Sequence, residues 1–362
     1  MKILFITRKY PPIVGGMEQY SYRLIKEFSN SDNKIHKITL GKRQYWLPLF
    51  IPHALFKGWK ICRKKDIDIV HFQDGAWTFF AYLFKLISKK PVAITFHGTD
   101  VSWDGPFYQA ALRKFLPKLD RIYCVSEGLK KELAKKGVPR NMIHVINNGI
   151  DPKSIQRTGN KEKAKKDLAN YYGYHKDSKV LVTVGRIRER KGQLWFVENC
   201  LDKIKGDFVY IIVGDGMGRE ELEDLILEKN TSNVFMTGNI TPLPGRRITR
   251  ILEAADVFLM PNIHVEGEYE GFGIVNTEAS AFGVPVVAAN IGGVGDAVED
   301  KVSGIMVKPG DSEAYARAVN SLLRSAKKRK ELGKNGMDMV KRKFTWNKVM
   351  KAYEKDFKKV AK

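Results

Sequence analysis

Short apolar segments alternate with amphipathic segments and glycine turns along the whole chain, and this alternation is what most limits the possible folds. The pattern opens with an apolar strand at residues 2–7, a turn rich in Pro and Gly at 8–16 and an amphipathic helix at 17–28. A strand, a glycine turn and a helix in this order begin an open parallel sheet, which binds ligands at the carboxyl ends of its strands. Further strands of this half are expected at 67–72, 92–96, 122–125 and 144–146.

The second half of the chain repeats the same plan, and the turn residues at 147–151 suit a linker between the halves. Its strands are expected at 180–184, 208–213, 234–237, 257–260, 286–289 and 304–307. We therefore predict an α/β protein with two doubly wound, Rossmann-like domains, residues 1–150 and 151–344, that face an interdomain cleft. The charged tail is expected to form helices, including one near 346–360.

The stretch 270–285 contains the strongest candidate for a binding site. A glycine turn at 271–273 opens a short helix expected at 274–282. The first N–H groups of a helix have no partner within it, so they form an anion site that suits a diphosphate. The N–H groups concerned here are those of Gly273, Ile274 and Val275.

Two carboxylates flank this turn, and they need separate roles. Glu278 lies about one turn inside the expected helix, where its side chain leans back toward the N-terminus and can accept two ribose hydroxyls. Glu270 precedes the turn and can accept a hydrogen bond from a sugar hydroxyl. The alternative interpretation is that both are solvated acids at a helix end. Two negative charges beside a phosphate also require compensating cations.

Candidate cations follow the first strand of the second half. Gly185 and Arg186 come directly after that strand, and Lys191 closes the same loop. At the carboxyl end of a strand, Arg186 and Lys191 could offset the charge of a leaving diphosphate, although a solvated surface loop would have the same composition. In the first half, His97 follows the strand at 92–96 and precedes Gly98, so it is expected at the ligand-binding edge of its sheet.

Two other motifs have simpler explanations. Asp66 and Asp68 resemble a metal-binding Asp-x-Asp pair, but they begin a strand at the edge opposite the expected ligand site, so we expect no metal there. The cluster at 214–218 lacks the spacing of a dinucleotide fingerprint, and Gly214 is expected to line a nucleotide pocket rather than an NAD site. We expect neither a metal nor another cofactor.

The formal charge of +23 is unevenly distributed. Residues 1–150 hold 26 Lys and Arg against 11 Asp and Glu, and residues 327–362 hold 14 against 4, whereas the segment between them is nearly neutral. Three widely spaced cysteines fit neither a disulfide framework nor a metal cluster. The chain has no apolar run long enough to span a membrane and no signal peptide, so a cytoplasmic location is expected.

With these residues assembled, the chain resembles the retaining glycosyltransferases of family 4 (group 1), which have the GT-B architecture of two Rossmann-like domains. The likeness covers nearly the whole length, and the pair Glu270 and Glu278, with seven residues between them, is its most specific element. The other matching positions are the turn at 15–18, the His97 turn, the stretch at 148–151, Gly185 with Arg186, and Lys191 with Gly192.

The resemblance implies a role for each of these positions. Arg186 and Lys191 would bind the donor diphosphate, Gly16 would approach it, and Glu278 would bind the ribose. Glu270 and the backbone of Phe272, Gly273, Ile274 and Val275 would hold the transferred sugar, with His97 hydrogen-bonded to it. The last helix, from about residue 345, would join the first domain.

The implied reaction moves a hexosyl group from a nucleoside diphosphate sugar to an acceptor hydroxyl, with retention at the anomeric carbon and without a metal. A hydrolase is disfavoured because a turn and a helical turn separate the two carboxylates, whereas retaining hydrolases hold them about 5 Å apart. A sugar-nucleotide epimerase on the same fold stays open as an alternative. A nucleic-acid-binding protein is supported by net charge alone, and we expect no nucleic acid partner.

Basic and aromatic residues interleave at 42–65 and 77–90, a pattern that suits the surface of an anionic membrane. This pattern favours a lipid-linked or anionic glycan acceptor and a peripheral position on the inner face of the cell membrane. An equally simple interpretation is that the apolar residues are core and the lysines only solubilise. The order of residues around 260–275 also resembles the mannosyltransferases of phosphatidylinositol mannosides, which makes GDP-mannose the leading donor, with UDP-sugars as the alternative.

Overall fold

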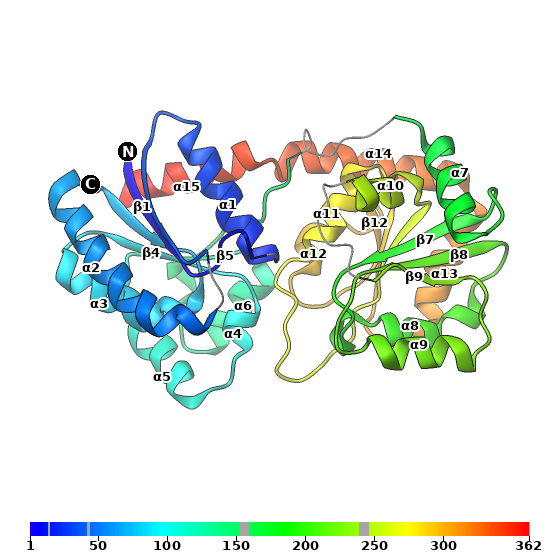
Figure 1. Cartoon of the computed structure of the whole chain (residues 1–362), viewed down its shortest axis with the longest axis horizontal. Coiled ribbons are helices and arrows are strands. Elements are labelled where there is room, and N and C mark those ends of the chain that lie inside the picture. The colour runs from blue at the N-terminus through cyan, green and yellow to red at the C-terminus, as the bar shows by residue number, and fades with distance from the viewer. Residues whose placement is uncertain (14, 42–43, 152–158, 239–245, 362) are drawn as a thin grey trace. The chain divides into compact units, whose positions relative to one another are not determined.

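The structure, a computed structural model, describes residues 1–13, 15–41, 44–151, 159–238 and 246–361. Residue 14 of the first predicted turn and residues 42–43 of the basic, aromatic stretch lie outside these ranges. The chain divides into two compact units, each built around a six-stranded parallel sheet (Figure 1). The first unit comprises Met1–Gly149, Tyr269–Phe272 and Phe344–Lys362, and the second comprises Ile150–Glu268 and Gly273–Lys343.

The sheet of the first unit has the strand order β2-β1-β3-β4-β5-β6, and every pairing in it is parallel. Its strands are β1 (Lys2–Thr7), β2 (Lys34–Thr39), β3 (Ile69–Phe72), β4 (Val92–Phe96), β5 (Arg121–Cys124) and β6 (Ile143–Val145). Its helices are α1 (Gly16–Ser29), α2 (Leu47–Lys65), α3 (Thr78–Ser88), α4 (Thr99–Ser102), α5 (Pro106–Phe115), α6 (Glu127–Lys135) and α15 (Trp346–Val360).

Alternate residues of β1 face opposite layers of helices, as the period of a strand requires. Ile3 and Phe5 pack with α1 and α15, which run side by side on one face (Figure 1). Ile6 points to the other face, where the ring of Phe84 on α3 lies against Gly58 of α2. Because both faces are covered, the strands other than β2 are mostly apolar, which is why they could be predicted from the sequence.

The sheet of the second unit has the order β12-β11-β10-β7-β8-β9, again with parallel pairings throughout. Its strands are β7 (Lys179–Val184), β8 (Phe208–Val213), β9 (Val234–Met236), β10 (Val257–Met260), β11 (Val286–Ala289) and β12 (Gly304–Val307). Its helices are α7 (Lys161–Tyr172), α8 (Gln193–Asn199), α9 (Arg219–Glu228), α10 (Arg246–Ala254), α11 (Ile274–Ala281), α12 (Val294–Ala297), α13 (Ser312–Arg324) and α14 (Ala326–Lys343).

Two apolar layers cover this second sheet. Residues of α8, α9 and α13 pack on the face that carries Leu181 and Leu259, and residues of α7, α10 and α11 pack on the face that carries Val182 and Phe258. The order of the strands is that of a doubly wound dinucleotide-binding sheet. The predicted α/β class with two Rossmann-like sheets is confirmed.

Every predicted strand is present, with ends that differ by at most two residues, and the helix expected near 346–360 is α15. One strand, β2, was not predicted. It is an edge strand, and only Ile38 of its residues is buried, so it lacks the apolar run by which the other strands were found. Across the described ranges, every helix is too short or too polar to cross a membrane.

Candidate functional site

The topology of the second unit places two loops at one switch point. The strands β7 and β10 are neighbours at the centre of the sheet, and the chain continues from β7 toward β8 on one side and from β10 toward β11 on the other. Loops that leave adjacent strands in opposite directions open a crevice at the carboxyl edge of the sheet, where open α/β sheets bind ligands. The loop after β7 carries the predicted residues Gly185, Arg186 and Lys191.

The start of this loop is tied to the end of β8. The N–H of Gly185 donates to the oxygen of Val213 at 2.9 Å, and the N–H of Ile187 donates to the oxygen of Asp215 at 2.9 Å. A Cβ on Gly214 would overlap the backbone oxygen of Gly185, so only glycine fits there. The structure therefore brings the predicted residues Gly185 and Gly214 into contact.

The end of the loop folds back over its beginning. A Cβ on Gly185 would lie 4.0 Å from Nζ of Lys191, so the ammonium group stands over the glycine that follows β7. Gly192 has φ of 69° and lies against the backbone of Pro261, the residue after β10. The side chain of Arg186 is exposed to solvent. Both predicted cations thus belong to a loop seated between the ends of β7 and β10.

The buried side chain of Gln193 supports this loop from within. Its Nε2 donates to the backbone oxygen of Arg186 at 3.2 Å, and the residue has no exposed surface. Gln193 was not predicted as a site residue, because a polar residue at a helix start gives no sign in the sequence that it reaches back to an arginine seven positions earlier.

The helix α11 begins next to the same edge. Gly273 precedes it with φ of 72°, no side chain in the described part of the chain caps its N-terminus, and a Cβ on Gly273 would lie 3.4 Å from Cε of Met260 at the end of β10. The predicted N–H groups of Gly273, Ile274 and Val275 therefore start a helix at the carboxyl edge of the sheet, where an anion is favoured. The structure agrees with the predicted start of this helix.

A second polar group lies at this helix end. Asn276 is fully buried, and its amide nitrogen would be 2.8 Å from a Cβ on Gly273. Within the described ranges, neither its nitrogen nor its oxygen has a hydrogen-bond partner. Buried amides are normally hydrogen-bonded, so Asn276 is a further candidate for ligand binding that the sequence analysis did not identify.

Glu278 lies one turn inside α11 and is half-buried. Burial raises the pKa of its carboxyl group to about 7. A ligand that donates hydrogen bonds to this carboxylate stabilises its charged form, which burial disfavours. The two hydroxyls of a ribose are such donors. Perturbed carboxyl groups of this kind are concentrated at functional sites.

In the first unit, His97 follows β4 in a turn organised by Asp100. The two carboxylate oxygens of Asp100 accept hydrogen bonds from the N–H groups of His97, Gly98 and Gly75 at 2.8 to 3.1 Å. Asp100 is buried and was not predicted, although its place three residues after His97 and two after a glycine is a recognisable turn signal.

The surroundings of His97 favour a neutral imidazole. Burial lowers its pKa, and the nearby Asp100 carboxylate only partly opposes this effect. Nε2 of His97 lies 3.0 Å from the backbone oxygen of Gln73, and since a carbonyl oxygen only accepts, Nε2 carries the proton. Nδ1 is left as an acceptor, suited to a sugar hydroxyl.

The segment Tyr269–Phe272 belongs to the first unit and contacts the His97 turn. A Cβ on Gly271 would overlap the backbone oxygen of His97, and Oγ of Ser126 donates to the oxygen of Gly271 at 2.6 Å. Phe272 is buried, with its ring centroid 5.5 Å from that of Phe344. The structure thus brings His97 together with the segment that contains the predicted residues Glu270 and Phe272.

Gly16 starts α1 at the carboxyl end of β1, and no atom of the other described residues, its chain neighbours and its own helix backbone aside, lies within 4 Å of a Cβ built on it. The buried Glu18 stands two residues later and pairs with Lys9 at 3.3 Å. In contrast, Asp66 and Asp68 lie at the opposite edge of the sheet, where the carboxylate of Asp68 accepts a hydrogen bond from the N–H of Lys2 at 2.8 Å.

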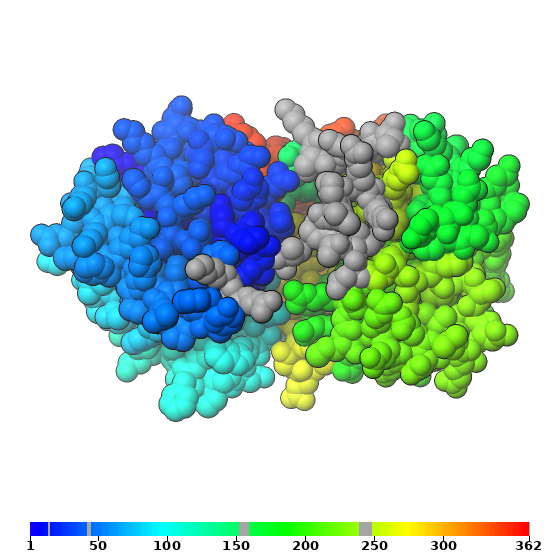
Figure 2. All heavy atoms as spheres, viewed as in Figure 1, coloured from blue at the N-terminus to red at the C-terminus, as the bar shows by residue number. Residues whose placement is uncertain are grey.

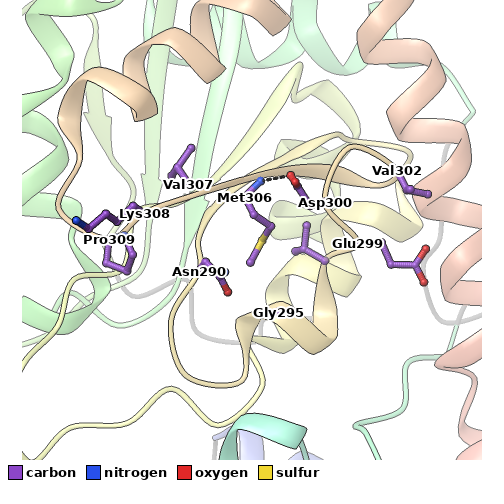
Figure 3. Close-up of a pocket in the computed structure, with 10 residues that line it drawn as sticks. Asn290, Gly295, Glu299, Asp300, Val302, Met306, Val307, Lys308 and Pro309 are labelled. Atoms are coloured by element: carbon purple, nitrogen blue, oxygen red, sulfur yellow. Dashed lines mark hydrogen bonds between the residues drawn. The ribbon is translucent and has the colours of Figure 1, made fainter.

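A hollow of about 770 Å³ in the second unit does not involve the predicted residues (Figure 3). It lies among β11, α12 and β12, and its two acidic residues have partners. Asp300 accepts from the N–H of Met306 at 2.8 Å, and Glu299 pairs with Arg342 on α14 at 3.4 Å. Size alone therefore does not locate the candidate site.

Two family models match the chain. Residues 165–339 match the model of glycosyl transferases group 1, and residues 14–154 match the model of Glycosyltransferase Family 4. The chain belongs to the family 4, group 1 glycosyltransferases. Its two sheets are accordingly those of the GT-B fold, and the family predicted from the sequence is confirmed.

Relatives of the same length are known in several organisms. The chain is 26% identical over 385 residues to an uncharacterized glycosyltransferase of Methanocaldococcus jannaschii, covering 97% of this chain and 96% of that one. It is 26% identical over 375 residues to the GDP-mannose-dependent alpha-(1-6)-phosphatidylinositol monomannoside mannosyltransferase of Mycolicibacterium smegmatis, covering 95% of each. A crystal structure of Anabaena HepE in complex with UDP-glucose has a TM-score of 0.78, 19% identity, and coverage of 99% of this chain and 100% of that one.

Proposed function

We propose that this glycosyltransferase moves a hexosyl group from a nucleoside diphosphate sugar to an acceptor hydroxyl, with retention at the anomeric carbon and without a metal. The observation that carries the proposal is the loop after β7, in which Lys191 stands over Gly185 and Gln193 holds the backbone of Arg186. Two cations at the switch point suit the diphosphate of a leaving nucleotide.

In the proposed reaction, the bond between the anomeric carbon and the diphosphate oxygen breaks, and its electron pair leaves with the diphosphate. Arg186, Lys191 and the N-terminus of α11 stabilise the negative charge that builds up on this group. The acceptor oxygen bonds to the anomeric carbon, and its proton passes to a diphosphate oxygen. Fixed positive groups can thus supply the charge stabilisation that a metal gives in other transferases.

The remaining residues bind the donor. Glu278 accepts hydrogen bonds from the ribose hydroxyls, His97 accepts one from the transferred sugar through Nδ1, and Glu270 binds another hydroxyl of that sugar. Gly16 leaves room for the diphosphate. The donor is GDP-mannose or a UDP-sugar, a choice supported by the mannosyltransferase relative and by the HepE complex.

The surface of α2 and α3 supports a lipid-linked or anionic glycan acceptor and a peripheral position on the inner face of the membrane. These helices pack together and carry exposed apolar side chains beside basic ones. The ammonium group of Lys60 lies 4.3 Å from the ring centroid of Phe56, and the guanidinium of Arg63 lies 5.0 Å from that of Trp59. Such a surface combines apolar contact with attraction to anionic lipids. Figure 2 shows α2 at the surface of the first unit.

The test is a screen of UDP-, GDP- and ADP-sugars by thermal shift, followed by a transfer assay with the donor found, for the wild type and Arg186→Ala. A ligand that binds only the native state raises the melting temperature, so the nucleotide sugar that gives the largest increase is identified as the donor. We expect Arg186→Ala to lose transferase activity. Full activity of this variant would contradict the role proposed for Arg186 at the donor diphosphate. Incubation with donor alone separates a transferase from an epimerase, which would change the sugar without an acceptor.

A further inference from the structure

A cavity of about 510 Å³ lies in the first unit, at the carboxyl end of β2 and beside the first turns of α2. It contains none of the residues assigned above to the donor. Its lining includes Lys37, Gly41, Trp46, Leu49, His53 and Lys57.

The polar residues of this cavity favour an anion. Lys37 and Lys57 supply two ammonium groups, and none of the described residues that line the cavity is acidic. Nζ of Lys37 lies 3.2 Å from the hydroxyl of Tyr10 and 5.2 Å from the centroid of its ring, which holds the cation in place. His53 and Lys57 are four residues apart on α2 and so share one face of the helix.

The apolar residues of the cavity extend onto the open surface. Leu49 is 67% exposed and Trp46 is 38% exposed, while Phe50 beside them is buried. Contiguous groups of large apolar side chains on a protein surface mark interaction or ligand-binding sites. Ammonium groups and exposed apolar side chains in one cavity suit a ligand that is both anionic and apolar.

The cavity adjoins the turn that leads to Gly16. The N–H of Leu40 donates to the oxygen of Thr7 at 3.0 Å, and a Cβ on Gly41 would lie 3.1 Å from the oxygen of Pro11. Pro11 is part of the connection between β1 and α1. The cavity is therefore at the carboxyl edge of the sheet, the same edge at which His97 follows β4.

We propose that this cavity binds a phosphate ester carried on an alkyl chain and is the acceptor's anchoring subsite. Lys37 and Lys57 bind the phosphate, and Trp46 and Leu49 contact the first carbons of the chain. The description as an acceptor subsite rests on the proposed transferase function, whereas binding of the amphiphile does not.

The test is calorimetric titration of the full chain, without nucleotide sugar, against octyl phosphate, dihexanoyl phosphatidic acid, inorganic phosphate and octyl glucoside. We expect octyl phosphate to bind at least about tenfold more tightly than inorganic phosphate or octyl glucoside, because each of these lacks one of the two contacts. Tighter binding of the phosphatidic acid than of octyl phosphate would identify a membrane lipid as the source, and the reverse would identify a single-chain carrier. Equal binding of inorganic phosphate and octyl phosphate would overturn the proposal.

The variant for this test is Lys37→Glu with Lys57→Glu, and its matched control is Lys64→Glu with Lys65→Glu, the same charge change at positions outside the cavity lining. We expect the first pair to weaken octyl phosphate binding at least about tenfold and the control pair to change it by about twofold or less. Equal losses in both would overturn the subsite.

The donor-induced thermal shift is measured in the same preparations. If the wild type binds octyl phosphate but shows no shift with any donor, the proposed function fails while the cavity assignment stands. If the donor shift is normal and no amphiphile binds, the cavity assignment alone fails.

Discussion

Oγ of Ser126 donates a hydrogen bond of 2.6 Å to the backbone oxygen of Gly271, a residue 145 positions later in the chain. Ser126 also caps α6, since its Oγ accepts from the N–H of Leu129 at 3.1 Å. Gly271 in turn lies against the backbone of His97. One serine therefore connects the end of β5, the segment with Glu270 and the His97 turn.

We expect Ser126→Ala to reduce kcat/KM by about tenfold or more, because small displacements of substrate-binding groups are costly to catalysis. The loss of the helix cap should also lower stability by about 1 kcal/mol. The matched control is Asn160→Ala, which removes the cap of α7, where Asn160 accepts from the N–H of Lys163 at 2.9 Å. Initial rates and urea unfolding of both variants test this. An equal drop in activity for both would show that Ser126 acts only through stability.

The substitution Gly16→Ala tests donor binding separately from folding stability. Its chain neighbours and its own helix backbone aside, a Cβ at this position meets no other described residue within 4 Å, and alanine in a helix is favoured over glycine by roughly 0.5–1 kcal/mol. We expect Gly16→Ala to keep or raise the melting temperature and to raise the donor KM by about tenfold, because the methyl group enters the space assigned to the diphosphate. An unchanged KM would remove Gly16 from the donor site.

Gly192→Ala is the informative contrast to Gly16→Ala. Gly192 has φ of 69°, and its Cβ would overlap the backbone oxygen of Pro261. We expect this variant to lower the melting temperature measurably, since both the dihedral angle and the contact require glycine.

The buried strands and the start of α11 were predictable because they depend on local pattern. Apolar runs such as Val92–Phe96 are buried on both faces, and Gly273 ends one segment and opens a helix whatever surrounds it. The strand β2 was not predicted because most of its residues are exposed or only partly buried, so its sequence has no continuous apolar run. The roles of Ser126, Asp100 and Gln193 could not be predicted from the sequence for another reason. Each depends on which backbone groups the fold brings near the side chain, and serine, aspartate and glutamine at turns and helix starts are otherwise ordinary.

The pKa of Glu278, raised by burial to about 7, gives a pH dependence of defined sign. In the unfolded chain the carboxyl titrates near its ordinary value of 4.5, so between these two values the folded protein binds more protons than the unfolded chain does. The contribution of Glu278 to stability therefore falls as pH rises from 4.5 toward 7, and Glu278→Gln lacks this fall. We expect the unfolding free energy of the wild type, minus that of the variant, to be smaller at about pH 8 than at about pH 5.

Denaturant unfolding at the two pH values measures this difference, and the exposed Glu221→Gln on α9 is the control. Donor binding should show the opposite trend, because only the ionised Glu278 accepts from both ribose hydroxyls. We expect the wild-type donor KM to fall as pH rises through about 7 and the KM of Glu278→Gln to be higher and flat. A flat wild-type profile would contradict the ribose assignment.

Gln193 separates a positioning role from a purely structural one. Its Nε2 holds the backbone of Arg186 at 3.2 Å, but its Oε1 has no partner within the described ranges, so Gln193→Leu removes one hydrogen bond and one unsatisfied buried atom together. These effects oppose each other in stability, and we expect a change of about 1 kcal/mol or less.

Activity should respond differently, because Arg186 is proposed to act on charge that develops only as the diphosphate leaves. We expect Gln193→Leu to lower kcat by about tenfold with little change in the donor KM, the signature of an interaction lost in the transition state. Asn320→Ala is the control, since the buried Asn320 also donates to a backbone oxygen, that of Lys203 at 2.9 Å, and accepts from the N–H of Lys205. Removing both of its bonds should cost more stability than Gln193→Leu does and leave kcat unchanged. If kcat instead follows stability in both variants, Gln193 does not position Arg186.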